Sequence, residues 1–324
     1  MKRRAFITLL GGATIGWPLT AQTQSAMPVI GFLNGQTAAG FTYLVAAFQH
    51  GLNEQGFVDG QNVKIEYQWA NGHLDQVPGL AADLLRRQPA VIVAAGGANV
   101  AAIAATKTIP IVATFGGDPV KQGFVASLNH PGGNVTGVNA FSSDLEAKRL
   151  ELIHEIAPQG SVIGYLFDPN IDMAELERHA LEAAARTEGR EVRIVPASAD
   201  TELETAFATL AEAHVGGLVV SSTPLFINLR DRVLKLTAGL KVAVIYDSRQ
   251  FVVAGGLMSY GASVPEVYRQ IGNYAGRILK GEKPADLPLL QPAKFDMSIN
   301  LRTAKALGID VPTSILLRAD EVIE

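Results

Sequence analysis

Short apolar runs and amphipathic segments alternate along the chain from about residue 28 onward. The runs are rich in β-branched residues, as buried parallel strands are, and the segments between them repeat apolar residues three and four positions apart, as helices do. The clearest helical face contains Phe41, Leu44 and Phe48. The strands predicted in this first series are residues 29–33, 63–69, 91–95, 111–115 and 135–138.

The same alternation restarts after Pro158. Two successive series of strand and helix units favour two parallel sheets, each covered by helices on both faces. The sequence therefore predicts an α/β fold with two lobes. The second series consists of strands at 162–167, 192–195, 218–220 and 242–246 and helices near 172–188, 201–214 and 225–238.

The joints between the two series determine how the lobes connect. A helix is predicted at 146–156, and Gly255 and Gly256 precede one more strand at 257–260, a helix at 264–279 and a strand at 295–299. If the strand at 257 returns to the first sheet and the strand at 295 joins the second, the chain crosses between the lobes three times. The periodicity permits this path without establishing it. The path assigns residues 28–140 and 257–283 to lobe 1, and residues 141–256 and 284–324 to lobe 2.

The first 25 residues have the order of an export signal. Lys2, Arg3 and Arg4 form a basic start, residues 5–19 are mostly apolar and uncharged, and a short polar stretch follows. The apolar part is shorter than the roughly 20 residues of a membrane span, so we expect a cleaved signal rather than a retained anchor. The paired arginines fit the twin-arginine pattern as well as a Sec signal. In both cases the protein is expected in the periplasm.

Composition adds limits on partners and chemistry. Hydrophobic residues make up 48% of the 324 residues and charged residues 18%, which is typical of a globular chain. Since the signal holds three of the 27 basic residues, the remaining chain carries 24 basic and 31 acidic residues, and this balance does not favour nucleic acid as a partner. The chain has no cysteine, which excludes thiolate catalysis and thiolate metal sites.

Small and polar residues follow most of the predicted strands, at the edge where open parallel sheets bind ligands. Glycine lets a ligand approach the backbone, and the start of the next helix offers free N–H donors to a carboxylate. Asp118 or Asp247 would hold an ammonium group, and aromatic residues would form apolar walls. The expected ligand-binding residues are Asn34, Gln36, Trp69, Gly97, Ala98, Phe115, Gly117 and Asp118 in lobe 1, and Asp168, Thr223, Tyr246 and Asp247 in lobe 2.

Several of these residues also have a local structural interpretation. Thr223 and Asp118 each precede a proline, which is the arrangement of a helix cap followed by proline at the first helical position. Trp69 can equally belong to the core, and Asp247 can pair with Arg249 instead of a ligand.

Motifs of enzymes and metal sites are mostly missing from the sequence. No glycine-rich dinucleotide motif follows the first strand, and no phosphate-binding loop motif occurs. Ser259 resembles half of a nucleophile elbow, but the position two before it is Leu257 rather than glycine. The six histidines contain no i, i+4 pair. We therefore expect no catalytic residue, no metal ion and no cofactor.

Eight segments, taken together, are specific to one family. They are 60–63 (GQNV), 66–70 (EYQWA), 114–120 (TFGGDPV), 127–137 (SLNHPGGNVTG), 255–261 (GGLMSYG), 276–284 (GRILKGEKP), 304–308 (AKALG) and 318–323 (RADEVI). Through them the chain resembles, from about Val29 to Glu324, the exported substrate-binding proteins of ABC transporters in the TrpX-like group.

The resemblance implies a type I periplasmic-binding-protein fold, with two Rossmann-like lobes joined by a three-crossing hinge. It also implies a monomer that captures an amino acid or a similar small carboxylate, aromatic in some relatives, and delivers it to a membrane ABC permease. Gln36, Phe115 and Tyr246 would then shape the side-chain pocket. The residues that would hold the amino-acid backbone are Gly97, Ala98, Gly117, Asp118, Thr223 and Asp247.

Two other functions fit the same scaffold. An exported enzyme would need a nucleophile and a base in the cleft, and turnover of a bound ligand would identify it. A ligand-sensing receptor would signal through its closed form to a membrane kinase, and the neighbouring genes would separate sensing from transport. A transcription regulator is disfavoured, since no helix-turn-helix precedes Val29.

Overall fold

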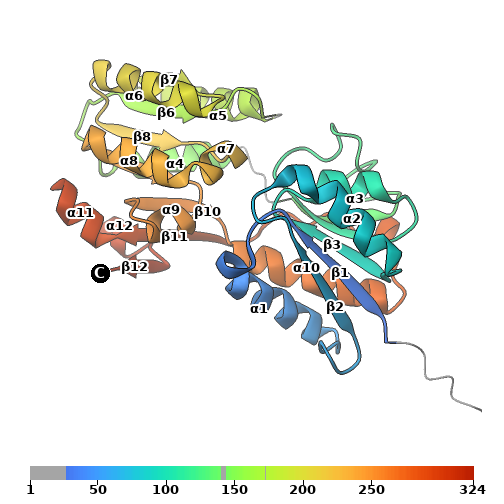
Figure 1. The fold of residues 1–324 in the computed structure, drawn as a ribbon. Helices are drawn as coiled ribbons and strands as arrows, with labels where there is room; N and C mark the ends of the chain where they lie inside the picture. Colours follow the sequence, from blue (N-terminus) through green and yellow to red (C-terminus); the bar gives the residue numbers. More distant parts are fainter. Residues whose placement is uncertain (1–26, 140–143, 172) are drawn as a thin grey trace, which may run out of the picture.

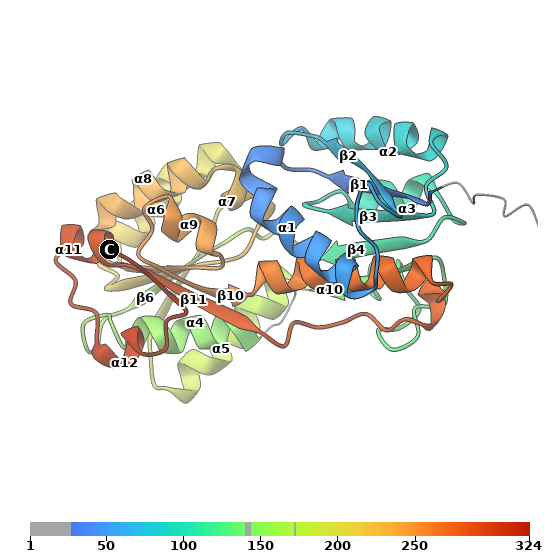
Figure 2. The ribbon, with the colours of Figure 1, turned by 90° about the horizontal axis from the view of Figure 1, so that it is seen from below.

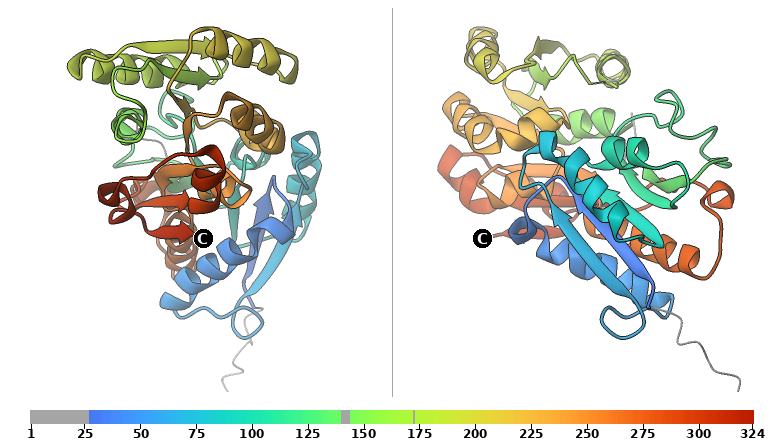
Figure 3. Two further views of the ribbon diagram at one scale, coloured as in Figure 1. Left: turned by 90° about the vertical axis from the view of Figure 1, so that its left-hand side faces the viewer. Right: turned by 45° about the vertical axis from the view of Figure 1, so that its right-hand side comes forward.

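The protein forms two α/β lobes that lie side by side (Figure 1). The computed structural model describes residues 27–139, 144–171 and 173–324, so the export signal predicted for residues 1–25 lies outside the described residues. Each lobe is built on one sheet, with helices on both of its faces (Figure 3). The expected α/β class with two helix-flanked, mainly parallel sheets is confirmed.

Lobe 1 contains a five-stranded parallel sheet in the order β2-β1-β3-β4-β5. All five residues of its central strand β3 are buried, because helices cover both faces of the sheet. The strands are β1 (Val29–Asn34), β2 (Lys64–Trp69), β3 (Val91–Ala95), β4 (Ile111–Phe115) and β5 (Val135–Asn139).

Two pairs of helices cover the first sheet. The helices α1 (Ala38–Glu54) and α10 (Val264–Leu279) share one hydrophobic core with one face of the sheet, and the helices α2 (Val77–Arg86) and α3 (Asn99–Ala105) share a second core with the other face. The contact between α1 and α10 is close, since a Cβ atom on Gly51 would lie 1.8 Å from the carbonyl oxygen of Arg269. The short helix η1 (Leu74–Gln76) precedes α2.

Lobe 2 contains a seven-stranded sheet in the order β12-β11-β10-β9-β8-β6-β7, in which only β10 and β11 pair antiparallel. Its strands are β6 (Ile163–Phe167), β7 (Val192–Pro196), β8 (Gly217–Val220), β9 (Ala243–Tyr246), β10 (Met258–Ala262), β11 (Phe295–Asn300) and β12 (Glu321–Ile323).

The helices of lobe 2 also divide between two faces. On one face, α4 (Asp144–His154) and α5 (Ala174–Thr187) pack with α11 (Leu301–Leu307) and α12 (Thr313–Leu316). The elements on the other face are α6 (Leu203–Glu212), α7 (Pro224–Asn228), α8 (Arg230–Leu240) and α9 (Arg249–Val253), with the short helix η2 (Asp200–Glu202) before α6.

The structure corrects the expected path of the strand at 257–260. The sequence pattern assigns this strand, β10, to lobe 1 with residues 257–283, but it pairs in parallel with β9 and antiparallel with β11 in the second sheet. Met258 is accordingly buried in the core of lobe 2. Only the helix that follows, α10, lies on lobe 1 beside α1 (Figure 2). A short apolar run does not indicate which sheet it will join, since the pairing partners are distant in sequence.

The last crossing between the lobes also comes later than expected. After the short helix η3 (Pro284–Asp286), the amide of Leu289 donates to the carbonyl of Leu128 at 2.7 Å, and the amide of Leu290 donates to the carbonyl of Gly137 at 2.9 Å. Residues up to Leu290 therefore belong to lobe 1 rather than lobe 2. Among the elements that the structure describes, the chain changes lobe three times, between β5 and α4, between β10 and α10, and between Leu290 and β11.

Among the described residues, no helix combines the length and the hydrophobicity needed to cross a membrane.

Candidate functional site

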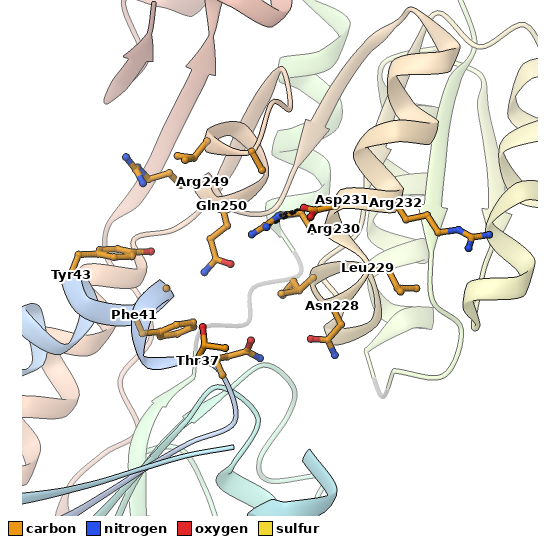
Figure 4. A pocket seen from close by; sticks show the side chains of 15 residues that line it. Thr37, Phe41, Tyr43, Asn228, Leu229, Arg230, Asp231, Arg232, Arg249 and Gln250 are labelled. Carbon is orange, nitrogen blue, oxygen red and sulfur yellow. Dashed lines mark hydrogen bonds and ion pairs between the residues drawn. The ribbon is translucent and has the colours of Figure 1, made fainter. Parts of the chain in front are cut away.

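A cavity of about 580 Å³, here called the outer cavity, lies between the two lobes. Its lobe 1 wall is the start of α1, with the side chains of Thr37, Phe41 and Tyr43 (Figure 4). Its lobe 2 wall comes from the turn between α7 and α8 and from α9, with Asn228 and Gln250 labelled in the same view. The cavity therefore has an aromatic side and a polar side, one from each lobe.

The tyrosine of this cavity lies close to the opposite lobe. Burial raises the pKa of the Tyr43 phenol above its usual value, and the nearby Arg249 guanidinium and Gln250 amide of lobe 2 act in the opposite direction. The pKa of Tyr43 in lobe 1 is therefore affected by side chains of α9 in lobe 2, across the gap between the lobes.

The arginines around the outer cavity are paired with carboxylates. Arg249 donates from Nε and Nη2 to the two carboxylate oxygens of Glu321, each at 2.6 Å. Arg230 pairs with Asp231 at 3.1 Å. Because these pairs are solvent-exposed to a large extent, the outer cavity is polar without a strong uncompensated charge.

A second cavity of about 150 Å³, here called the inner cavity, lies closer to the hinge. Gly116 at the end of β4 contributes the lobe 1 side, and Ser222 and Asp247 follow β8 and β9 of lobe 2. The remaining described residues that line it are Leu145, Glu146, Arg149, Glu177, Ser248, Ala262 and Val264.

A small third cavity of about 60 Å³ shares residues with both of the others. Tyr43 and Gln250 belong to it and to the outer cavity, and Asp247 and Ser248 belong to it and to the inner cavity. The three cavities therefore adjoin one another, and together they extend from the aromatic side chains of α1 to the Asp247 carboxylate at the end of β9.

Charged side chains of α4 and α5 are buried at the inner cavity. Arg149 and Glu146, each 2% exposed, form an ion pair three residues apart on α4. The Nε atom of Arg149 also donates to the carbonyl of Tyr260 on β10 at 2.8 Å. Glu177, near the start of α5, is 5% exposed.

The burial of these groups changes their proton affinity. Burial raises the pKa of Glu146, although contact with Arg149 works against this shift. Burial, reinforced by the neighbouring Glu146, raises the pKa of Glu177 to about 8. Burial alone would lower the pKa of Arg149, but the carboxylates around it, Glu146 first, hold that pKa above its usual value. Glu177 is consequently largely protonated at neutral pH, because it lacks the direct arginine partner that Glu146 has.

Asp247 faces the inner cavity. Its carboxylate accepts a hydrogen bond from the Ser222 hydroxyl at 2.7 Å. The local pair with Arg249 that the sequence allowed is replaced, since Arg249 binds Glu321. Of the twelve residues expected to bind a ligand, Gln36 lines the outer cavity and Asp247 lines the inner one.

Three other expected residues stabilise loops near the site through hydrogen bonds to residues close to them in sequence. Asp118 accepts from the amides of Val120 and Lys121 at 3.0 and 3.2 Å, and Asp168 accepts from the amide of Asn170 at 2.9 Å. Thr223 caps α7, as its alternative interpretation stated.

Asn34 connects the first strand end to α10. Its side-chain amide donates to the Tyr268 hydroxyl at 3.1 Å, and its side-chain oxygen accepts from the amide of Gln36 at 2.9 Å. It is fully buried, so it positions the loop before α1. This loop lies directly against the loop after β3, since a Cβ atom on Gly35 would be 2.3 Å from the carbonyl oxygen of Gly96.

The loops after β3 and β4 carry three more expected residues. Gly97 is exposed with a φ of +91°, and Ala98 is buried at the start of α3. Gly117 lies next to Gly116 of the inner cavity, and a Cβ atom on it would be 3.3 Å from the side chain of Gln122.

The expected aromatic walls lie in the hydrophobic cores instead of the cavities. Phe115 and Tyr246 are each 1% exposed. The Tyr246 ring stacks on Phe251 at a centroid distance of 4.6 Å, and its hydroxyl lies 2.8 Å from that of Thr237. Trp69 packs near Phe32 at 5.7 Å, as its core interpretation stated. In a buried parallel strand the last residues still point into the core, so a strand-end aromatic does not necessarily face the ligand edge.

Sequence reasoning missed the residues that give the site its character. The aromatic side comes from Phe41 and Tyr43, whereas the sequence pattern predicts Phe41 on the buried face of a helix. The pattern of α4 held a usable signal: Glu146 and Arg149 fall on the same helical face as Leu150 and Ile153, and all four are buried. Charged residues on an apolar face indicate a buried ion pair or a site.

No group of three or more histidine, cysteine, aspartate or glutamate side chains in the described part of the chain is arranged to hold a metal ion.

Comparisons with known proteins identify the family to which the chain belongs. Residues 29–323 match the family described as ABC transporter substrate binding protein. A tyrosine-binding protein of Clostridioides difficile (strain R20291) is 28% identical over 263 residues, which cover 81% of this chain and 75% of that protein.

Two solved structures are similar over nearly their whole length. One is an ABC domain in complex with L-Trp from Streptococcus pneumonia, with a TM-score of 0.79, 26% identity and coverage of 91% of this chain and 99% of that chain. The other is the ligand-free, open structure of a substrate binding protein with adhesive properties from Clostridium difficile, with a TM-score of 0.73, 27% identity and the same two coverages, 91% and 99%. These matches confirm the two-lobed binding-protein fold that the sequence resemblance implied.

Proposed function

The chain belongs to the family of ABC transporter substrate-binding proteins, and from this premise we propose that it captures an aromatic amino acid between its lobes. As a member of this family it is an extracytoplasmic protein that binds a small solute and supplies it to a membrane permease. The relatives that bind tyrosine and L-Trp support the choice of ligand.

The observation that carries the proposal is the run of cavities between the lobes. It places aromatic side chains, Phe41 and Tyr43, at one end and a hydrogen-bonded carboxylate, Asp247, at the other. An amino acid with an aromatic side chain has the matching chemistry, because its ammonium group suits Asp247 and its ring suits the apolar wall. The hydroxyl of Ser248, which lines the inner and the third cavity, is close to Asp247, and the hydroxyl of Thr37 lines the outer cavity; both can serve as donors to the ligand carboxylate.

Ligand binding is coupled to closure of the lobes in this proposal. A ligand that contacts both lobes favours the closed form by its additional contacts there. Small-angle scattering with and without a tight ligand tests this coupling, and superimposable profiles would contradict it.

A thermal-shift screen of the twenty amino acids tests the ligand class. A ligand at 100 times its dissociation constant adds about 2.7 kcal/mol to the stability of the folded state. We expect the largest shifts with L-tyrosine, L-tryptophan and L-phenylalanine. Absence of any shift with these three would reject an aromatic amino acid as the ligand, and recovery of an altered compound from the complex would indicate an enzyme instead of a carrier.

The proposal also includes the location and the assembly state. We infer a monomer in the periplasm, released after removal of residues 1–25 by Sec or twin-arginine export. Amino-terminal sequencing of the protein from a periplasmic extract tests the cleavage, and light scattering during size-exclusion chromatography tests the mass.

A further inference from the structure

We propose that the inner cavity is a proton-linked ammonium site, in which Glu177 releases its proton to solvent when the ammonium group of a ligand enters beside Asp247. This inference rests on the proposed function, since it requires a small amine-bearing solute between the lobes. It adds a specific role for Glu177 and a pH dependence of capture.

The first observation is an unsatisfied carboxyl group that faces the cavity. Glu177 lines the inner cavity and is 5% exposed. By distance and angle its Oε2 atom has no hydrogen-bond partner among the described residues, and the same holds for Oε2 of Glu146, which lines the same cavity. The neighbouring Tyr165 hydroxyl is a protein donor near Glu177, and it acts to lower the pKa of Glu177 without outweighing burial. Buried oxygens of this kind are costly unless a donor reaches them. A ligand ammonium group, with its N–H donors, is such a donor.

The size of the cavity fits the proposed group. Its volume of about 150 Å³ is several times the roughly 30 Å³ that one water occupies in the liquid. An ammonium group and the carbon that carries it fit in this space, and the rest of the ligand extends toward the outer cavity through Ser248 and Tyr43.

The charges around Glu177 favour a cation. The ionisable groups that face it are Glu146 and Arg149 from α4, Asp247 from the end of β9 and Tyr165 from β6. Burial raises the pKa of the Tyr165 phenol, so this group stays neutral. Arg149 is the only cation among the described residues that line the cavity, and Glu146 is its direct partner. Arg149 also attracts Asp247 and Glu177 at longer range, but its direct ion pair is with Glu146. Among the described residues, neither Asp247 nor Glu177 therefore has a cation as a direct partner.

The proton balance follows from this arrangement. In the empty protein Glu177 is largely protonated at neutral pH, since burial and Glu146 raise its pKa to about 8. An ammonium group nearby stabilises the carboxylate and lowers that pKa, so one proton leaves to the buffer for each cation bound. Affinity then rises with pH, by up to about tenfold per pH unit below about pH 8, because release of one proton accompanies binding.

Calorimetry of the exported chain tests the inference, with L-tyrosine and L-tryptophan as probes. Titrations in phosphate and in Tris at the same pH give the number of protons released, because the two buffers differ in ionisation heat. We expect close to one proton released between pH 6 and 7, and an affinity that rises about tenfold over that interval. Glu177→Gln should release none and show a flat pH profile.

A matched control comes from the same helix. Glu175 lies on α5, but its side chain is 68% exposed and paired with Arg178. Glu175→Gln should therefore keep the proton release and the pH slope of the natural protein. Loss of both in this variant would show that a general change of charge, and not the cavity, causes the effect.

An amine-free probe keeps the inference testable if Glu177→Gln does not fold. The compound 3-(4-hydroxyphenyl)propionate resembles tyrosine without its amine, and it should bind the natural protein more weakly and without proton release. Equal affinity or equal proton release would overturn the ammonium site.

The outcomes separate the two proposals. Tight binding of an aromatic amino acid without proton release, or with release retained in Glu177→Gln, overturns this inference and leaves the proposed function intact. No binding of L-tyrosine or L-tryptophan between pH 6 and 8 overturns the proposed ligand and the inference together.

Discussion

The outer and inner cavities lie in the same gap between the lobes, but they differ in how their charged side chains are paired and exposed to water. In the outer cavity, Arg249 and Arg230 are paired with carboxylates at the surface, where water screens them. In the inner cavity, Glu177 is buried without an ion-pair partner, and the half-buried Asp247 lines the same cavity. The exposed ion pairs of the outer cavity contribute little to the stability of the fold. The buried carboxyl group of the inner cavity lacks a direct cationic partner, which a ligand can supply. Under the proposed function, we therefore expect the inner cavity to set the affinity and the outer cavity to hold the ligand side chain.

The largest effect should come from removing the buried cation. Arg149→Ala leaves Glu146 buried without its partner, and loss of one member of a buried ion pair costs about 3–5 kcal/mol. Urea denaturation of the ligand-free protein measures this loss. The matched change in the outer cavity, Arg230→Ala, should cost less than about 1 kcal/mol. Equal losses for the two variants would remove the distinction between the cavities.

The next effect is the pH dependence of stability that Glu177 produces. Its pKa in the folded protein is about 8 and its ordinary value is 4.5, so the folded state holds a proton that the unfolded state has released. Stability from this group is therefore present below about pH 4.5 and declines as pH rises toward 8.

Glu177→Gln cannot ionise and should lack this decline. Relative to the natural protein, the variant should gain on the order of a few kcal/mol between pH 5 and pH 8, measured by denaturation of the ligand-free protein at each pH. A gain that does not change with pH would contradict the assigned protonation of Glu177.

Ligand affinity should respond to Asp247. If its carboxylate makes a charge-assisted hydrogen bond to the ligand amine, Asp247→Ala weakens binding of an aromatic amino acid by about 1–3 kcal/mol in calorimetry. The control Asp231→Ala removes an exposed carboxylate at the outer cavity, 85% exposed, and should leave the affinity nearly unchanged. Unchanged affinity in Asp247→Ala would exclude this residue from the site.

The smallest effect is expected at the pair between Arg249 and Glu321. Arg249→Gln removes two hydrogen bonds of 2.6 Å, but the pair is exposed, so stability should fall by less than about 1 kcal/mol in the same denaturation assay. A larger loss would show that the outer cavity also depends on a specific charge.

Part of the candidate site could be predicted from the sequence. Gln36 and Asp247 follow strands that the apolar runs identified, and the rule that ligands bind at carboxyl ends placed both beside the cavities. The same rule selected Phe115 and Tyr246, which are buried. It locates the edge of a sheet, but it does not give the direction of each side chain.

The sequence by itself determined the alternation of strands and helices, the two series and the absence of common catalytic motifs, because these depend on local spacing and residue type. Tertiary structure alone decided that β10 joins the second sheet and that Glu146, Arg149, Glu177 and Asp247 meet at one cavity. Strand pairing and the burial of charge depend on contacts between residues far apart in the chain, and no local pattern specifies which distant partners will meet.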